Sequence, residues 1–195
     1  MHRTLIALAL TAVFSASAFA QNAATETQRD TNQQNRVEQG LKSGQLTTKE
    51  AGQLERDEQL IDRTQAHDMK DGTLSAQEKA QIQREQNRAS RQIDQDKHNA
   101  ATGNPASKSS ERMQADVQRN ANQQARINQG VRSGQLTNKE AGSLEGGQAH
   151  VDRSEANAAR NGRVSAREQA RTQGKENRQN GHVYRKKHND ATRDD

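Results

Sequence analysis

The sequence contains no cysteine, and this absence removes several kinds of chemistry at once. A chain without thiols has no disulfide, no thiolate metal ligand, no redox pair and no cysteine nucleophile. Familiar catalytic motifs are also missing: there is no Gly-x-Ser-x-Gly, no His-Glu-x-x-His and no phosphate loop ending in Gly-Lys-Ser/Thr. Hydrophobic residues make up 28% of the chain, too few to build a dry pocket that holds reacting groups rigidly. We therefore do not expect an enzyme.

Aromatic residues are almost absent. Tyr184 is the only one beyond the first twenty residues, so the chain offers no row of rings on which nucleic-acid bases could stack. The 30 Lys and Arg are nearly balanced by 25 Asp and Glu, and the charges alternate in sign, which is typical of solvated helix faces. Nucleic acid is therefore not the expected partner. The thin core also leaves a second interpretation open, a largely disordered polyampholyte that folds on a partner.

The first twenty residues have the form of a secretory signal peptide. A positive start, Met1-His2-Arg3, precedes a small and apolar stretch that ends in Ala18-Phe19-Ala20. The stretch is short for a membrane span, and no later segment is apolar enough to cross a bilayer. We therefore expect export to the periplasm or the medium, with the mature chain beginning at Gln21 and retaining no transmembrane segment.

What the chain does contain is a duplication. Residues 33–47 return with few changes as residues 123–137, and the offset of 90 residues holds without a gap to the end of the chain. A polar segment that includes the only proline, Pro105, separates the copies and is typical of a flexible linker. The predicted organisation is a signal peptide (1–20), a first helical module (21–100), a linker (101–112) and a second helical module (113–195).

Each copy is expected to contain three helices, which makes the fold all-α. In the first copy, apolar residues recur at helical spacing in segments that begin near Gln28, Thr47 and Ser75. The corresponding segments of the second copy begin near Met113, Thr137 and Ser165. The last of these carries Gly174 and Gly181 where the first copy has arginine. Because glycine is a poor helix former, we predict that this helix is less stable than the third helix of the first copy.

Capping boxes mark four of the helix starts. In a capping box, a hydroxyl side chain accepts from the backbone N–H three residues later, and a glutamate at that position accepts from the N–H of the cap. A glycine three residues before each cap permits a left-handed turn. The four pairs are Thr47 and Glu50, Ser75 and Glu78, Thr137 and Glu140, and Ser165 and Glu168.

The turns before these helices are similar to the second half of an EF-hand loop. In residues 71–78, a glycine, an apolar residue, a hydroxyl and a glutamate fall at loop positions 6, 8, 9 and 12. His67 and Met69 occupy positions 1 and 3, however, and cannot supply the oxygens that calcium needs. The pattern favours an EF-hand-like helix–turn–helix pair, with Asp71 and Glu78 as the only candidate calcium ligands. Such a pair would place Leu46 against Leu74 and Leu136 against Val164.

Histidine gives a second metal hypothesis. His98 and His188 occupy equivalent positions and would meet if the copies packed with pseudo-twofold symmetry, which would suit zinc or copper. The alternative is a pair of helix-end cations that interact with the helix dipole. A weakly bound divalent metal, at Asp71 and Glu78 or at His98 and His188, is therefore the second functional hypothesis, and no other cofactor is expected.

The pattern Gln-Gly-x-x-Ser-Gly-x-Leu-Thr-x-x-Glu-Ala, followed by Gly-x-Leu-Ser-x-x-Glu and Lys-His-Asn, resembles a group of small exported bacterial repeat proteins of unknown function. The resemblance covers most of residues 33–100 and 123–190. It implies export and a helical repeat, and it carries no activity or site. The favoured interpretation is a non-catalytic exported helical protein that binds an unidentified protein or envelope component, or self-associates, through its polar helix faces.

Overall fold

A computed structural model describes residues 15–189 and 191, with side chains described from Ala23 onward. This part of the chain is all-α, as predicted, and contains no strand. The predicted signal peptide falls mainly on residues 1–14, which lie outside the described part; residues 15–20 are helical. The helices are α1 (Ser15–Ser43), α2 (Thr48–Asp68), α3 (Ala76–Lys97), α4 (Lys108–Ser133), α5 (Asn138–Ala159) and α6 (Ala166–Lys187).

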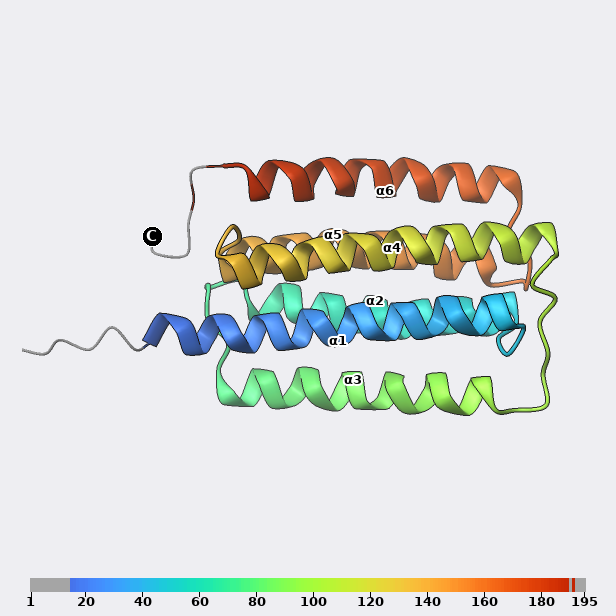
Figure 1. The fold of residues 1–195 in the computed structure, drawn as a ribbon, viewed down its shortest axis with the longest axis horizontal. Coiled ribbons are helices and arrows are strands. Elements are labelled where there is room, and N and C mark those ends of the chain that lie inside the picture. The colour runs from blue at the N-terminus through green and yellow to red at the C-terminus, as the bar shows by residue number, and fades with distance from the viewer. Residues whose placement is uncertain (1–14, 190, 192–195) are drawn as a thin grey trace, which may run out of the picture.

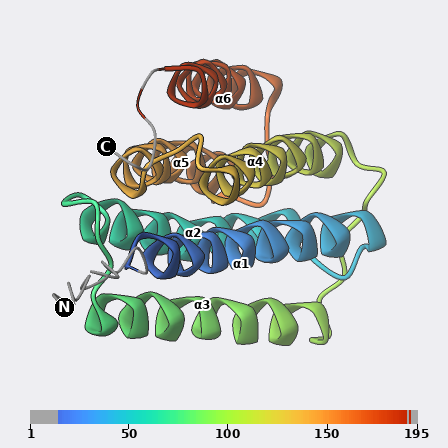
Figure 2. The ribbon, with the colours of Figure 1, turned by 60° about the vertical axis from the view of Figure 1, so that its left-hand side comes forward.

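The six helices lie in four layers (Figure 1). The two middle layers are the pairs α1–α2 and α4–α5, which we call the inner bundle. Within it, α2 packs most extensively on α5, and α1 on α4. Helix α3 covers the outer side of α1 and α2, and α6 covers the outer side of α4 and α5 (Figure 2). The largest contacts therefore join the two copies of the repeat, so the apolar residues of each copy pack against those of the other.

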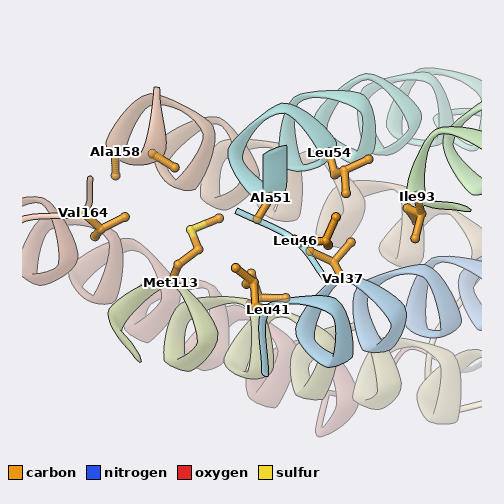
Figure 3. Close-up of a cluster of buried hydrophobic side chains, with 11 residues drawn as sticks. Val37, Leu41, Leu46, Ala51, Leu54, Ile93, Met113, Ala158 and Val164 are labelled. Carbon is orange, nitrogen blue, oxygen red and sulfur yellow. The ribbon is translucent and has the colours of Figure 1, made fainter. Parts of the chain in front are cut away.

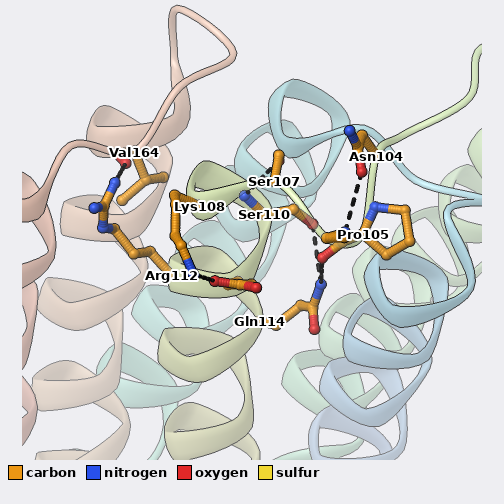
Figure 4. A network of polar contacts seen from close by, with 10 residues as sticks. Asn104, Pro105, Ser107, Lys108, Ser110, Arg112, Gln114 and Val164 are labelled. Atoms are coloured by element: carbon orange, nitrogen blue, oxygen red, sulfur yellow. Dashed lines mark hydrogen bonds and ion pairs between the residues drawn. The ribbon is translucent and has the colours of Figure 1, made fainter.

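The segment between α3 and α4 is shorter and better anchored than the sequence indicated. Ser107 caps α4, which begins at Lys108, so residues 108–112 of the predicted linker are helical. The N–H of Gly103 donates to the Gly44 carbonyl over 2.8 Å. The side chain of Gln114 donates to the Pro105 carbonyl over 2.9 Å (Figure 4). These bonds tie the connection to the turn between α1 and α2 in the first copy and to α4 in the second.

All four predicted capping boxes are confirmed. In the first, the N–H of Glu50 donates to Thr47 Oγ1 over 3.2 Å, and the N–H of Thr47 donates to the Glu50 carboxylate over 2.8 Å. The glycine three residues before each cap is left-handed in every case, with φ between 75° and 93°. These local contacts explain why the helix starts were predictable from the sequence.

The apolar core is divided into two clusters near the two ends of the inner bundle. The first contains Leu46 and Val164, and Figure 3 shows it built from side chains of both copies, among them Leu54 and Met113. The second contains Leu74 and Leu136. The predicted pairs Leu46 with Leu74 and Leu136 with Val164 are therefore wrong, because each turn packs with a turn of the other copy.

The reason lies in how α2 meets α5. A Cβ at Gly52 would lie 2.5 Å from the Cβ of Ala159, and a Cβ at Gly142 would lie 2.8 Å from the Cβ of Met69. The start of each helix thus lies against the end of the other, which makes the pair antiparallel. Glycine permits this close approach, since any larger residue would force the backbones apart. Residues 90 apart make equivalent contacts, so the inner bundle has pseudo-twofold symmetry.

Candidate metal centre

Carboxylates fill the middle of the inner bundle, between the two apolar clusters. Each is at most 2% exposed to solvent. The set consists of Asp30, Glu55, Glu58, Asp62, Glu145, Asp152 and Glu155. No Lys, Arg or His is among the buried side chains in the part of the chain that the structure describes. The acidic layer therefore has no buried cation to balance it.

These carboxylates form two groups, each with residues from both copies. One oxygen from each of Asp30, Asp62 and Glu145 lies within 4.8 Å of the others, and we call this group the first triad. The second triad consists of Glu55, Asp152 and Glu155, with the same spacing. The triads share no residue, and α2 and α5 contribute to both.

The repeat relates the triads, although imperfectly. With the offset of 90 residues, Asp62 corresponds to Asp152 and Glu55 to Glu145, so these four positions are acidic in both copies. The third member of each triad has no acidic counterpart: Asp30 of the first triad corresponds to Asn120, and Glu155 of the second triad corresponds to Gln65. Glu58, which belongs to neither triad, corresponds to Gln148.

Amide side chains hold the first triad in place. Asp30 accepts from Gln65 over 2.7 Å and from Gln86 over 2.6 Å, one bond to each of its oxygens. Gln124 donates to Asp62 over 3.3 Å and to Glu145 over 2.9 Å. Both oxygens of Asp30 are therefore occupied, whereas Asp62 and Glu145 each keep one buried oxygen that accepts from no amide.

The second triad is held by fewer donors. Asn120 donates to Asp152 over 2.6 Å and to Glu155 over 3.3 Å, and Gln34 donates to Glu55 over 3.0 Å. Each of the three carboxylates keeps one buried oxygen that accepts from no amide. Carboxyl groups pair with one another here, Glu55 with Glu155 and Asp152 with Asp62, and such pairs require a shared proton. The second triad thus presents three oxygens that no N–H donor occupies, one per residue.

Glu58 is the most unusual residue of the acidic layer. It is 2% exposed, and neither of its carboxylate oxygens accepts a hydrogen bond. By contrast, the buried Glu176 of α6 lies 3.1 Å from Arg119 Nε. Leaving a buried acceptor unpaired costs about 1–3 kcal/mol, and more if it is charged. Glu58 therefore needs a proton or a cation.

The electrostatics of the layer lead to the same requirement. Burial raises the pKa of Asp30 and of Glu55 to about 7. Burial, reinforced by repulsion from neighbouring carboxylates, holds the pKa of the other five well above the usual range. An ionised group in such a site costs several kcal/mol unless a counter-charge compensates it. At neutral pH the layer must retain protons or take up positive charge from outside.

The acidic layer also contains amide oxygens without a donor. Such oxygens belong to Gln34, Gln65, Gln86, Gln124 and Gln148, all of them buried. Acceptors therefore outnumber donors throughout the layer. Oxygen-rich sites of this composition, made of carboxylates and amide carbonyls, suit magnesium, calcium and manganese.

The sequence-predicted EF-hand residues lie elsewhere, on the surface turn between α2 and α3. One oxygen of Asp71 accepts from the N–H and the hydroxyl of Thr73, each over 2.9 Å. Glu78 accepts from the N–H of Ser75 over 2.8 Å as part of the cap. These bonds lower the pKa of both carboxyls. The two carboxylates are thus engaged in local turn and cap contacts.

The structure does not bring His98 and His188 together. They follow α3 and α6, which lie on opposite outer faces and end at opposite ends of the molecule (Figure 1). Each histidine is exposed, and its Nδ1 lies 2.7 Å from a carbonyl one turn earlier, that of Asp94 or of Tyr184. Both side chains are therefore placed at helix ends.

Sequence reasoning missed the acidic layer, although a signal was present. Glu58 lies four residues after Leu54 and three before Ile61, on the apolar stripe that predicted α2. Acidic residues on the buried stripe of a helix are unusual unless they are paired. Their recurrence on the equivalent stripe of α5 at Asp152 and Glu155 strengthens the signal.

Comparison with known proteins adds no relative: no family model, no curated protein and no solved structure matches the chain. None of the described helices has the length and apolar character needed to cross a membrane. The functional argument therefore depends on the geometry and chemistry of the acidic layer.

Proposed function

We propose that the protein binds divalent metal ions through the carboxylates at the centre of its inner bundle. The observation that carries this proposal is Glu58, a buried carboxylate with two unpaired oxygens and no buried cation nearby. A divalent ion would supply the missing positive charge and would accept several oxygen ligands at once. The proposal concerns binding and includes no reaction.

The ligands favour hard cations. All donors in the acidic layer are oxygens, which suit magnesium, calcium and manganese, whereas zinc and copper prefer nitrogen or sulfur. Di-iron four-helix bundles use a Glu-x-x-His motif on two of their helices, and this chain contains no such motif. We therefore name calcium and manganese as the ions to test first and zinc as the contrasting ion.

The test is metal titration of the processed protein after treatment with a chelator. Isothermal titration with calcium or manganese should give saturable binding. An ion at 100 times its Kd stabilises the folded state by ~2.7 kcal/mol, which for a chain of this size raises Tm by about 5–10 °C. Absence of both binding and stabilisation at millimolar metal would refute the proposal.

A matched pair of variants locates the site. Glu58→Gln keeps the shape of the side chain and introduces the residue found at the equivalent position of the second copy. It should weaken binding at least ~10-fold, since even residues that only support a metal ligand contribute that much. Asp94→Asn removes an exposed carboxylate of α3 and should leave affinity unchanged. Equal effects of the two substitutions would contradict a site in the acidic layer.

We also propose that this metal-binding protein is exported. The support is the leader-like segment 1–20. Ala23, the first described core residue, follows the expected cleavage site, so removal of the leader leaves the apolar clusters intact. Intact-mass measurement on protein from a bacterial periplasm or culture medium should show loss of residues 1–20. Full-length protein confined to the cytoplasm would contradict export.

A further inference from the structure

We infer that the inner bundle holds two cations, one in each triad, and that the second triad is the tighter site. This inference rests on the proposed metal-binding function and specifies its stoichiometry and order. Its basis is the presence of two oxygen clusters that have no residue in common and that differ in their hydrogen bonding.

The number of ions follows from the geometry and the charge. The triads contain six different carboxylates, three around each of two centres, so each triad can hold an ion of its own. An ion bound in one triad stabilises the ionised form of the carboxylates that it contacts and leaves the other triad without a counter-charge, whereas two ions supply one cation to each triad. Uncompensated buried charge is the costlier arrangement.

The two triads touch each other. Asp62 of the first triad and Asp152 of the second share a hydrogen bond between their carboxyl groups. Glu58, with both oxygens unpaired, adds negative charge beside them, since its electrostatic neighbours include Asp30 of the first triad and Glu55 and Asp152 of the second. Two ions bound in the triads would therefore be close neighbours.

The triads differ in how readily they can receive an ion. In the second triad each carboxylate has one oxygen that accepts from no amide, so an ion that replaces the shared protons gains three oxygens without breaking an N–H bond. In the first triad both oxygens of Asp30 are hydrogen-bonded, to Gln65 and Gln86, so an ion must displace at least one of these bonds to gain a third carboxylate. Breaking a buried hydrogen bond to a charged group costs about 1.5–3 kcal/mol, or roughly 10-fold to 150-fold in affinity. The second triad should therefore fill first.

Two substitutions separate the sites, with manganese as the probe. Glu155→Gln removes a carboxylate found only in the second triad and should weaken the tighter binding phase at least ~10-fold. Asp30→Asn gives the first triad the residue that the second copy has there, and it should weaken the looser phase while the tighter phase persists. Both variants remove a buried charge and keep the side-chain volume, so both should fold; helical circular dichroism checks this.

A third substitution tests the inference in the opposite direction. Gln65→Glu gives the first triad the carboxylate that Glu155 supplies to the second. It should tighten the looser phase and bring the two affinities closer together. This gain of binding does not depend on any loss of stability, so the inference stays testable if another variant unfolds.

The readouts are ion stoichiometry and electron spin resonance. We expect two manganese ions per chain, and at full occupancy a spectrum of two coupled spins that differs from that of an isolated ion. One ion per chain, two identical sites, or two uncoupled ions would overturn the inference and leave the proposed function standing. Failure of manganese, calcium and magnesium to bind at all would instead refute the proposed function.

Discussion

The metal-free protein should lose stability as the pH rises from 5 to 8. The perturbation is removal of divalent ions by a chelator, followed by a change of pH. Folding raises the pKa of Asp30 from 3.8 and of Glu55 from 4.5, in each case to about 7. Between about pH 4 and pH 7 the folded state therefore binds more protons than the unfolded state, so the free energy of unfolding falls as the pH rises.

The expected loss is several kcal/mol. One unit of pKa shift corresponds to about 1.4 kcal/mol, so each of these two shifts taken alone amounts to roughly 3–5 kcal/mol. The loss begins above pH 4, where the unfolded carboxyls ionise, and continues to about pH 7, where the folded ones follow. Because total stability is typically 5–15 kcal/mol, the metal-free protein should be marginal or unfolded at pH 8.

Urea denaturation at pH 5, 6, 7 and 8, followed by far-ultraviolet circular dichroism, measures this slope. Added calcium or manganese should restore stability at pH 8, because the ion replaces the lost protons. Asp30→Asn should flatten the slope, and Asp94→Asn, on the surface, should not. A stability that is constant or increases from pH 5 to 8 without metal would refute the reasoning, including the claim that the acidic layer is buried without a counter-charge.

Three further predictions concern stability. Gly52→Ala should lower the free energy of unfolding, measured by urea titration, by about 1–3 kcal/mol through overpacking, because its Cβ would lie 2.5 Å from that of Ala159. Gly146→Ala, whose Cβ would lie 3.4 Å from the nearest atom, should have a much smaller effect in the same titration. Thr47→Ala should cost ~1 kcal/mol through loss of the cap of α2, and thermal unfolding that leaves Tm unchanged would contradict this. Gly174→Ala should stabilise α6 by up to ~1 kcal/mol, because alanine is the better helix former and the atom nearest to the added Cβ would lie 3.9 Å away. Higher helicity on partial unfolding would show this gain.

Local features of this fold were predictable from the sequence because the residues that form them are close together in the chain. The pair of Thr47 and Glu50, with Gly44 before it, contains all the hydrogen-bonding groups of the cap within seven residues. The same holds for the other three helix starts. The spacing of apolar residues predicted the helices themselves, although α4 begins at Lys108 and not near Met113.

The packing between copies was not predictable, because a repeat offers two equivalent solutions. Leu46 can pack with the other turn of its own copy or with the corresponding turn of the second copy, and both turns carry the same kind of residue. The choice depends on Gly52 and Gly142, which allow α2 and α5 to approach closely. The acidic layer depends on the same choice, since each triad combines residues from both copies.

The pseudo-twofold axis between α2 and α5 has a consequence for the origin of the molecule. A chain of half this length could close the same inner bundle by pairing with an identical chain, because equivalent contacts recur 90 residues apart. In such a homodimer every substitution would be present on both sides of the axis. In one polypeptide that constraint is absent, so Asp30 can differ from its counterpart Asn120, and Gln65 from its counterpart Glu155. Splitting the chain within residues 98–107 and mixing the halves would show whether two separate halves can form this bundle.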